Sequence, residues 1–301
     1  MIMEVDTVKG FKDYLPPESL KKEAVKKIIE QQFQLHGFIP IETPIIEFDE
    51  LMKPDILASE EEDSAVSERF KLKDRAGRNL GLRYEFTFQL ARLLKQNPNI
   101  KLPFLRYQIG PVFRDEPIGA SRFRQFIQCD ADIIGDASFD ADTECLSLTK
   151  DILQALKIKN QIIEINNRKL LQSIIESTEI TSIKEVMREL DKIDKLGEDI
   201  VKANLRKYAD GNQVLTLFKL LEKDISFFKE NAFDGATDLI ELQKKCKNYG
   251  IPVKINPLLV RGFSYYTGTI FEIGEPGKPA ISAGGRYDKL IGIFGGKDIP
   301  A

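Results

Sequence analysis

The sequence has few cysteines, a single histidine and no long apolar run. Its cysteines are Cys129, Cys145 and Cys246, and its histidine is His36. An odd number of cysteines without metal-ligand spacing argues against a disulfide framework or a zinc site, and it is typical of free thiols in a reducing cytosol. Because His36 follows a predicted helix far along the chain from the polar motifs, we do not expect a protein imidazole to act as a general base.

The apolar and charged residues exclude further classes of protein. No stretch approaches the ~18 apolar residues that a membrane-spanning helix requires, and the N-terminal segment has no apolar signal core. The chain carries 44 Lys and Arg against 47 Asp and Glu, so its net charge of −3 gives no overall basic field that would attract nucleic acid. We therefore expect a soluble, cytoplasmic protein in which any RNA binding depends on local groups of arginines.

The spacing of apolar residues predicts an α+β protein. Helices are expected over 19–35, 87–96 and 142–156. Strands are expected over 38–46, 70–73, 79–84, 104–113, 123–134, 161–165, 253–255, 258–260, 269–273 and 280–283. Pro40 and Pro44 lack a backbone N–H, so the strand over 38–46 is expected at an edge or an interface.

A change of pattern in the second half predicts the domain organisation. Strand signals vanish between residues 167 and 249, where helical periodicity dominates. The length of 301 residues is itself typical of about two domains. We predict one main domain built from residues 1–166 and 250–301, with an all-helical insertion over residues 167–249.

The most informative stretch is the predicted hairpin at 104–134, whose strands flank a turn at 117–121. Side chains alternate along a strand with period two. One face of the hairpin is therefore expected to carry Arg106, Gln108, Arg114, Glu116, Arg124, Phe126, Gln128, Asp130 and Asp132. This face is poor core material, and it suits a polyanion with a ring to stack and a small polar molecule beside it.

Several motifs then occur along the chain in one order. They are 10–16 with the Pro44 strand, LRYEFT at 82–87, FRDE at 113–116 with RFRQF at 122–126, NRKLL at 167–171, DKIDK at 191–195, LVRGFSYYTGT at 259–269 and AGGRYD at 283–288. With these motifs the chain resembles the histidyl-tRNA synthetase family of class II aminoacyl-tRNA synthetases over essentially its whole length. The resemblance implies an antiparallel sheet flanked by helices, the helical insertion, and a homodimer formed through the first motif.

The resemblance also implies a set of ATP-binding residues. Arg114 is expected to clamp the α-phosphate, and Glu116 to accept from the adenine amino group. Phe126 is expected to stack on adenine, and Arg122 to meet the terminal phosphates or the tRNA acceptor end. Arg261 is expected to bridge the α-phosphate and the histidine carboxylate, so Arg114 and Arg261 are the predicted catalytic residues. A guanidinium suits both tasks because its planar fork binds phosphate or carboxylate with two N–H groups.

The predicted histidine pocket needs acceptors for an ammonium and for an imidazole. Glu85 and Thr87 are expected to hold the α-ammonium group of histidine. The side chains expected around the rest of the amino acid are Gln128, Asp132, Tyr265, Tyr266 and Tyr287, together with Arg261. Imidazole has a nitrogen at each end, so recognition by the carboxylate of Asp132 and the phenol of Tyr266 is chemically apt.

By this resemblance the protein joins histidine to ATP as histidyl-adenylate and transfers the histidyl group to tRNA(His). Mg²⁺ accompanies ATP, and no metal ligand from the protein is predicted. One alternative is the synthetase-like regulatory subunit of ATP phosphoribosyltransferase, which shares the core. Another is a non-catalytic paralogue that binds RNA or only dimerises.

Two departures from the family pattern qualify the expectation. The family continues beyond the position of Ala301 into a third motif and an anticodon-binding domain, so we expect weak or absent aminoacylation by residues 1 to 301 alone. Ser264 stands where the family commonly has an acidic residue, which loosens the predicted pocket locally.

Overall fold

A computed structural model describes residues 5–52, 69–119, 122–262 and 265–301. Contacts within the chain divide it into two compact units. Unit 1 comprises residues 1–136 and 289–299, and unit 2 comprises residues 137–288 and 300–301. The boundaries predicted at 166/167 and 249/250 fall inside unit 2, and they stay a prediction about domains. The expected acidic loop at 59–68 and Ser264 lie outside the described residues.

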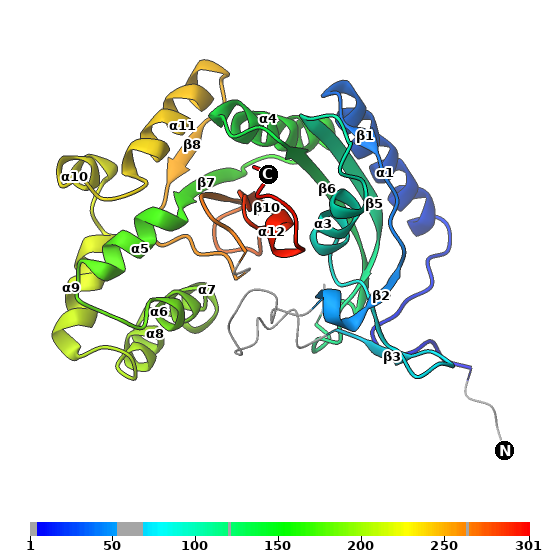
Figure 1. The fold of residues 1–301 in the computed structure, drawn as a ribbon, viewed down its shortest axis with the longest axis horizontal. Helices are drawn as coiled ribbons and strands as arrows, with labels where there is room; N and C mark the ends of the chain where they lie inside the picture. The colour runs from blue at the N-terminus through cyan, green and yellow to red at the C-terminus, as the bar shows by residue number, and fades with distance from the viewer. Residues whose placement is uncertain (1–4, 53–68, 120–121, 263–264) are drawn as a thin grey trace. The chain divides into compact units, whose positions relative to one another are not determined.

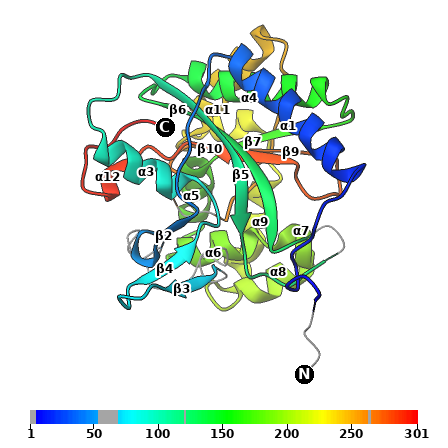
Figure 2. The same ribbon diagram turned by 90° about the vertical axis from the view of Figure 1, so that its right-hand side faces the viewer.

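The described residues of unit 1 form two three-stranded sheets with helices beside them (Figures 1 and 2). Its elements in chain order are α1 (Glu18–Leu35), β1 (Ile39–Pro40), β2 (Ile46–Phe48), the 3-10 helix η1 (Asp49–Met52), β3 (Lys71–Lys73), β4 (Asn79–Leu82), α3 (Thr87–Gln96), β5 (Phe104–Phe113), β6 (Gln125–Ile134) and α12 (Leu290–Ile293). The first sheet has the order β1-β5-β6, with β1 parallel and β6 antiparallel to β5. The second has the order β2-β4-β3 and is antiparallel throughout.

Helix α1 packs on β5 through aromatic and polar contacts (Figure 2). The rings of Phe33 and Tyr107 lie 4.9 Å apart, and the Tyr107 hydroxyl donates to Glu30 at 3.0 Å. Phe33 and Tyr107 are both 2% exposed, so this contact covers one face of the sheet. Burying aromatic side chains of this size contributes strongly to stability, at about 25 cal/mol per Å² of apolar surface. Helix α1 therefore covers one face of the hairpin, and the polar side chains of the hairpin lie on the opposite face.

In unit 2, the residues that the structure describes form one four-stranded sheet and several helices. Its elements are α4 (Phe139–Ala155), β7 (Ile162–Asn167), α5 (Arg168–Glu176), α6 (Ile183–Leu190), α7 (Ile193–Leu196), α8 (Glu198–Leu205), α9 (Gly211–Leu221), α10 (Ile225–Glu230), α11 (Ala236–Asn248), β8 (Val253–Ile255), β9 (Thr269–Gly274) and β10 (Ser282–Gly285). The sheet order is β10-β9-β7-β8, antiparallel except for the parallel pair of β7 and β8. Figure 1 shows α6, α7 and α8 side by side.

The apolar core of unit 2 joins one face of this sheet to the helices. Ile165 on β7 is fully buried in that core, and Ile255 and Phe271, its partners on β8 and β9, pack against it. Directly paired residues share a face of a sheet. The next row along the strands therefore points to the other face, where Lys254, Glu164 and Glu272 lie. One face of the sheet builds the core, and the other carries charged side chains.

The single strand predicted over 38–46 is instead two short strands, β1 and β2, which lie in different sheets. Two further details of the predicted strands are wrong. Residues 258–260 form no strand, because the Asn256 side chain accepts from the Leu258 N–H at 3.0 Å and its carbonyl accepts from the Leu259 N–H, which together make a turn. The face predicted to run from Arg106 to Glu116 is shorter, since β5 ends at Phe113. Glu116 lies beyond the end of the strand, and its backbone carbonyl accepts a hydrogen bond from the Arg124 side chain.

Candidate active site

The hairpin of β5 and β6 places a row of polar side chains on one face, where the two from β5 are buried and the two from β6 are half-buried. Arg106 lies opposite Asp132, and Gln108 lies opposite Asp130, as the predicted alternation requires. Arg106 is fully buried and forms an ion pair with Asp132, and Gln108 is 2% exposed. We call these four residues the buried polar row. A guanidinium this deep is tolerated because carboxylates compensate its charge.

Negative charge exceeds positive charge around this row. Asp130 accepts from Gln128 at 2.9 Å and interacts electrostatically with Arg106, Asp132 and Glu85. Burial is the main cause that raises the pKa of Asp130 to about 7, and the neighbouring carboxylates add to it. A region with several carboxylates and one buried guanidinium suits a cationic guest such as an ammonium group.

Glu85 is held rigidly at the start of α3. Its two carboxylate oxygens accept from the backbone N–H groups of Thr87 and Phe88, at 2.5 and 2.8 Å. These are donors that the first turn of a helix leaves without an intrahelical partner. Burial raises the pKa of Glu85, while these hydrogen bonds act in the opposite direction. Glu85 therefore stabilises the helix N-terminus in this structure, and the predicted contact with an ammonium would be an additional task.

The predicted ATP-binding residues of unit 1 lie together where the hairpin ends. The Arg114 guanidinium stands 5.2 Å from the centre of the Phe126 ring, and its Nε donates to the Tyr84 carbonyl at 3.2 Å. Glu116 lies 3.8 Å from Arg114 and 3.4 Å from Arg122. We call Arg114, Glu116, Arg122 and Phe126 the arginine group. It combines positive charge for phosphates with an aromatic ring and a carboxylate, which is a combination suited to a purine nucleotide.

The predicted residues of unit 2 form a second group. Tyr265 lies 4.9 Å from Tyr266 and 5.9 Å from Tyr287, measured between ring centres, and all three are at most 8% exposed. Arg261 Nη1 donates to Glu272 at 2.6 Å across the charged face of the sheet. Arg286, which follows Gly285, forms a buried ion pair with Asp142 at 2.6 Å.

Sequence reasoning overlooked the partners of these side chains. Glu272, which forms an ion pair with Arg261, carried no signal of its own because this pairing depends on how strands and loops meet. Asp191, which interacts electrostatically with Arg261, begins the DKIDK motif, but no role was assigned to it. Asp130 was placed on the right face of the hairpin by the alternation, but no role was assigned to it. Its position between Gln128 and Asp132, both predicted pocket residues, is the signal that could have identified it.

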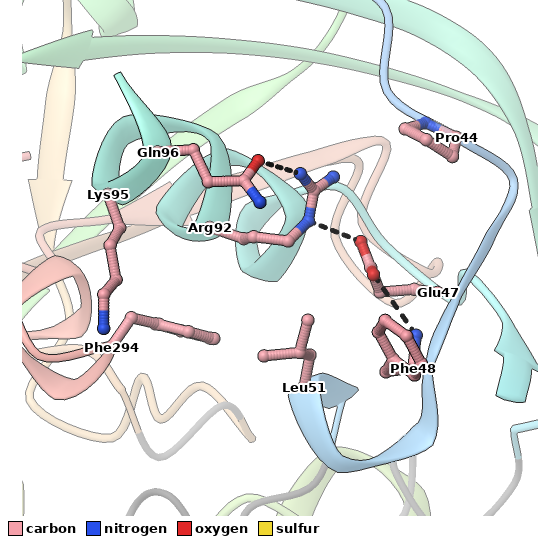
Figure 3. A pocket seen from close by; sticks show the side chains of 8 residues that line it. All are labelled: Pro44, Glu47, Phe48, Leu51, Arg92, Lys95, Gln96 and Phe294. Atoms are coloured by element: carbon pink, nitrogen blue, oxygen red, sulfur yellow. Dashed lines mark hydrogen bonds and ion pairs between the residues drawn. The ribbon is translucent and has the colours of Figure 1, made fainter. Parts of the chain in front are cut away.

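A pocket of about 570 Å³ lies within unit 1 on another side of α3 (Figure 3). It is lined by Pro44, Glu47, Phe48, Leu51, Arg92, Lys95, Gln96 and Phe294. Arg92 donates to Glu47 at 2.7 Å and to Gln96 at 2.9 Å, so its charge is compensated within the pocket wall. None of the side chains predicted to bind ATP or histidine lines this pocket.

Among the residues that the structure describes, no helix combines the length and apolar character needed to cross a lipid bilayer. The three cysteines, all within the described ranges, are free thiols. Burial is the main cause that raises the pKa of Cys129 to about 12, so this thiol is a weak nucleophile.

Comparison with known proteins relates the chain to one family. Residues 10–301 match the family model of histidyl-tRNA synthetase. Histidine–tRNA ligase 1 of Bacillus anthracis is 40% identical over 317 residues, which cover 99% of this chain and 73% of the relative. The crystal structure of histidyl-tRNA synthetase from Nostoc sp. PCC 7120 covers 99% of this chain and 72% of its own, with a TM-score of 0.84 and 28% identity.

A second solved structure shares the fold. It is an ATP phosphoribosyltransferase regulatory subunit/histidyl-tRNA synthetase from Bacillus halodurans, with a TM-score of 0.84 over 100% of this chain and 80% of its own. Its identity of 21% shows a common architecture alone. The match of the family model and the 40% identity to a ligase are more specific. This chain belongs to the histidyl-tRNA synthetase family.

Proposed function

We propose that this protein activates histidine with ATP and transfers the histidyl group to the 3′ end of tRNA(His). The observation that carries the proposal is the arginine group at the end of the β5–β6 hairpin, in a chain that is 40% identical to a histidine–tRNA ligase over 99% of its length. Membership of the family supplies the substrate class, and the geometry of the group supplies the chemistry.

The first reaction brings two anions together, since the histidine carboxylate attacks the α-phosphorus of ATP. Fixed positive charge lowers the barrier to this approach. Two unit charges 4 Å apart interact by roughly 4 kcal/mol at an effective dielectric near 20, so each well-placed guanidinium matters. Arg114 binds the α-phosphate, Phe126 stacks on adenine, and Glu116 accepts from the adenine amino group. Arg122 takes the terminal phosphates.

The amino acid is recognised by side chains of opposite charge. Glu85 and Thr87 hold the ammonium group, and Gln128 lies near the α-carbon. Asp132 and Tyr266 take the two imidazole nitrogens, while Tyr265 and Tyr287 line the ring. Arg261 contacts the α-phosphate and the histidine carboxylate. The buried polar row supports this assignment, because its surplus of carboxylates suits a cationic amino acid.

Further expectations follow from the family. Mg²⁺ arrives with ATP, since this ion binds through substrate phosphates and needs only one or two carboxylates from a protein. The protein works in the cytoplasm as a homodimer formed through the Pro44 segment. Exposed apolar side chains near that segment, Ile39, Ile45 and Ile46, support a covered surface there.

The test is histidine-dependent exchange of pyrophosphate into ATP, followed by charging of tRNA(His) transcripts. Exchange with histidine and not with the other amino acids supports the proposal. Absence of exchange, together with copurification of a phosphoribosyltransferase chain, would favour the regulatory alternative. Retention of a stable dimer that binds neither ATP nor histidine by calorimetry would favour the non-catalytic paralogue.

A further inference from the structure

Arg261 forms an ion pair with Glu272, which lies on strand β9. Its Nη1 donates to Glu272 Oε2 at 2.6 Å, and the two side chains are 24% and 29% exposed. Glu272 lies directly opposite Glu164 on β7, and like charges at such positions repel. Glu164 is compensated by Lys254 at 2.8 Å and by Asn256 at 2.9 Å. Arg261 therefore provides the corresponding compensation for Glu272.

A second carboxylate approaches the same loop from the helical segment. Asp191 follows the last residue of α6, and its Oδ2 lies 3.3 Å from the point where a Cβ on Gly262 would stand. Burial, the larger effect, raises the pKa of Asp191, and the charge of Arg261 acts to lower it. A Cβ at position 262 would force the Asp191 carboxylate to shift by a few tenths of an ångström, so glycine at this position favours the close approach.

The hydrogen bond to Glu272 uses only one of the nitrogens of the Arg261 guanidinium. Glu272 occupies one terminal nitrogen, and Arg261 Nε is buried, but the side chain as a whole remains 24% exposed, so a ligand can reach its other N–H groups. A guanidinium carries five N–H donors in one plane, so it can be fixed by a carboxylate at one edge and still bind a ligand oxygen at another. A long side chain that is fixed before a ligand binds loses less rotamer freedom on binding.

We infer that Glu272 and Asp191 are positioning residues that hold the Arg261 guanidinium ready for the anionic centre of the reaction. Through Asp191 the helical segment takes part in the activation of histidine. The inference rests on the proposed function, since it assigns these two carboxylates to the reaction in which Arg261 acts. They act through Arg261 and do not touch the substrates themselves.

The experiment compares Glu272→Gln and Asp191→Asn with matched controls in the whole protein. Histidine-dependent pyrophosphate exchange should lose about ten- to hundredfold in kcat for Glu272→Gln, the range expected when a hydrogen bond to a charged group is removed, and less for Asp191→Asn. Glu164→Gln removes a carboxylate from the same face of the sheet, and Asp194→Asn removes one from α7. Both controls should keep normal kcat.

A second measurement separates positioning from a structural role. A sulfamoyl analogue of histidyl-adenylate is titrated by calorimetry into the unaltered protein, into Arg261→Ala, into Glu272→Gln and into the double variant. If Glu272 acts through Arg261, the double variant binds the analogue no more weakly than Arg261→Ala alone. Additive losses, or a normal kcat in both Glu272→Gln and Asp191→Asn, would overturn the inference.

The outcomes also separate this inference from the proposed function. If the whole unaltered protein shows no histidine-dependent exchange, the proposed function fails, and the inference fails with it. If exchange occurs but the losses are additive, only the inference fails. Should Glu272→Gln lower the melting temperature strongly, Glu272→Asp replaces it, because the shorter carboxylate keeps the charge and displaces the guanidinium. That variant should still lose kcat, and a normal kcat would count against positioning.

Discussion

The raised pKa of Asp130 predicts how the stability of this protein changes with pH. The Asp130 carboxyl group faces Arg106 and Gln108 from β5, Gln128 and Asp132 from its own strand, and Glu85 from the segment before α3. The folded-state pKa of about 7 lies above the ordinary value of 3.8. The folded protein therefore keeps a proton that the unfolded chain has already released between these two pH values. Asp130 favours folding most at low pH, and this contribution is lost as the pH rises through about 7.

The size of the effect follows from the two pKa values. One pKa unit corresponds to ~1.36 kcal/mol, so the difference between about 7 and 3.8 sets an upper limit of about 4 kcal/mol. The Asp130 side chain keeps part of its surface exposed to water, which screens its charge. We therefore expect about half of that upper limit, ~2 kcal/mol. Asp130→Asn keeps the shape of the side chain and removes the proton equilibrium. The free energy of unfolding of the variant minus that of the unaltered protein should therefore increase by ~2 kcal/mol from pH 4.5 to pH 8.

The assay is denaturant unfolding at a series of pH values, with the free energy of unfolding plotted for both proteins. The difference between the two curves should grow as the pH rises from about 4 to about 7 and level off above that. Asp194→Asn, which removes an exposed carboxylate on α7, is the control and should run parallel to the unaltered protein. Parallel curves for Asp130→Asn as well would show that the buried polar row does not raise the pKa of Asp130.

Three further predictions test other parts of the structure. Gly285→Ala should lower the melting temperature, because a Cβ there would stand 2.5 Å from the Thr269 carbonyl on the neighbouring strand; an unchanged thermal transition would contradict this packing. Asp142→Asn should cost about 1.5–3 kcal/mol in the free energy of unfolding, since it removes the nearer carboxylate from the largely buried Arg286 guanidinium and leaves Asp288 at 3.6 Å, and a loss below 1 kcal/mol by urea titration would refute the estimate. Asp132→Ala should weaken histidine binding by calorimetry more than ATP binding, and an unchanged histidine affinity would remove Asp132 from the pocket.

Local patterns in the sequence were enough to predict much of the hairpin and the helices. The helix at Thr87–Gln96 and the strand at Val253–Ile255 have the predicted bounds. Alternation placed Arg106 and Gln108 on the face that also carries Asp130 and Asp132, which the register confirms. Such features depend on side-chain period and turn residues within a few positions, and this information is contained in the chain itself.

The ends of the strands could not be predicted in this way. β6 begins at Gln125 because the Arg124 N–H donates to the carbonyl of Gly10, a residue more than a hundred positions earlier. The turn at Asn256 depends in addition on Asn166, whose side chain donates to the Pro257 and Leu259 carbonyls at 3.0 Å. Each boundary is set by a hydrogen bond to a distant residue.

The sequence by itself determined the family and the α+β class, and it supplied the side chains that we propose for histidine activation, because motifs and periodicity are local properties. Only the tertiary structure decided how those side chains are held: Glu272 and Asp191 beside Arg261, and Asp130 within reach of Arg106. Charge compensation acts through space, between residues far apart in the chain. Its partners are therefore fixed by the packing of strands and helices and not by their order in the sequence.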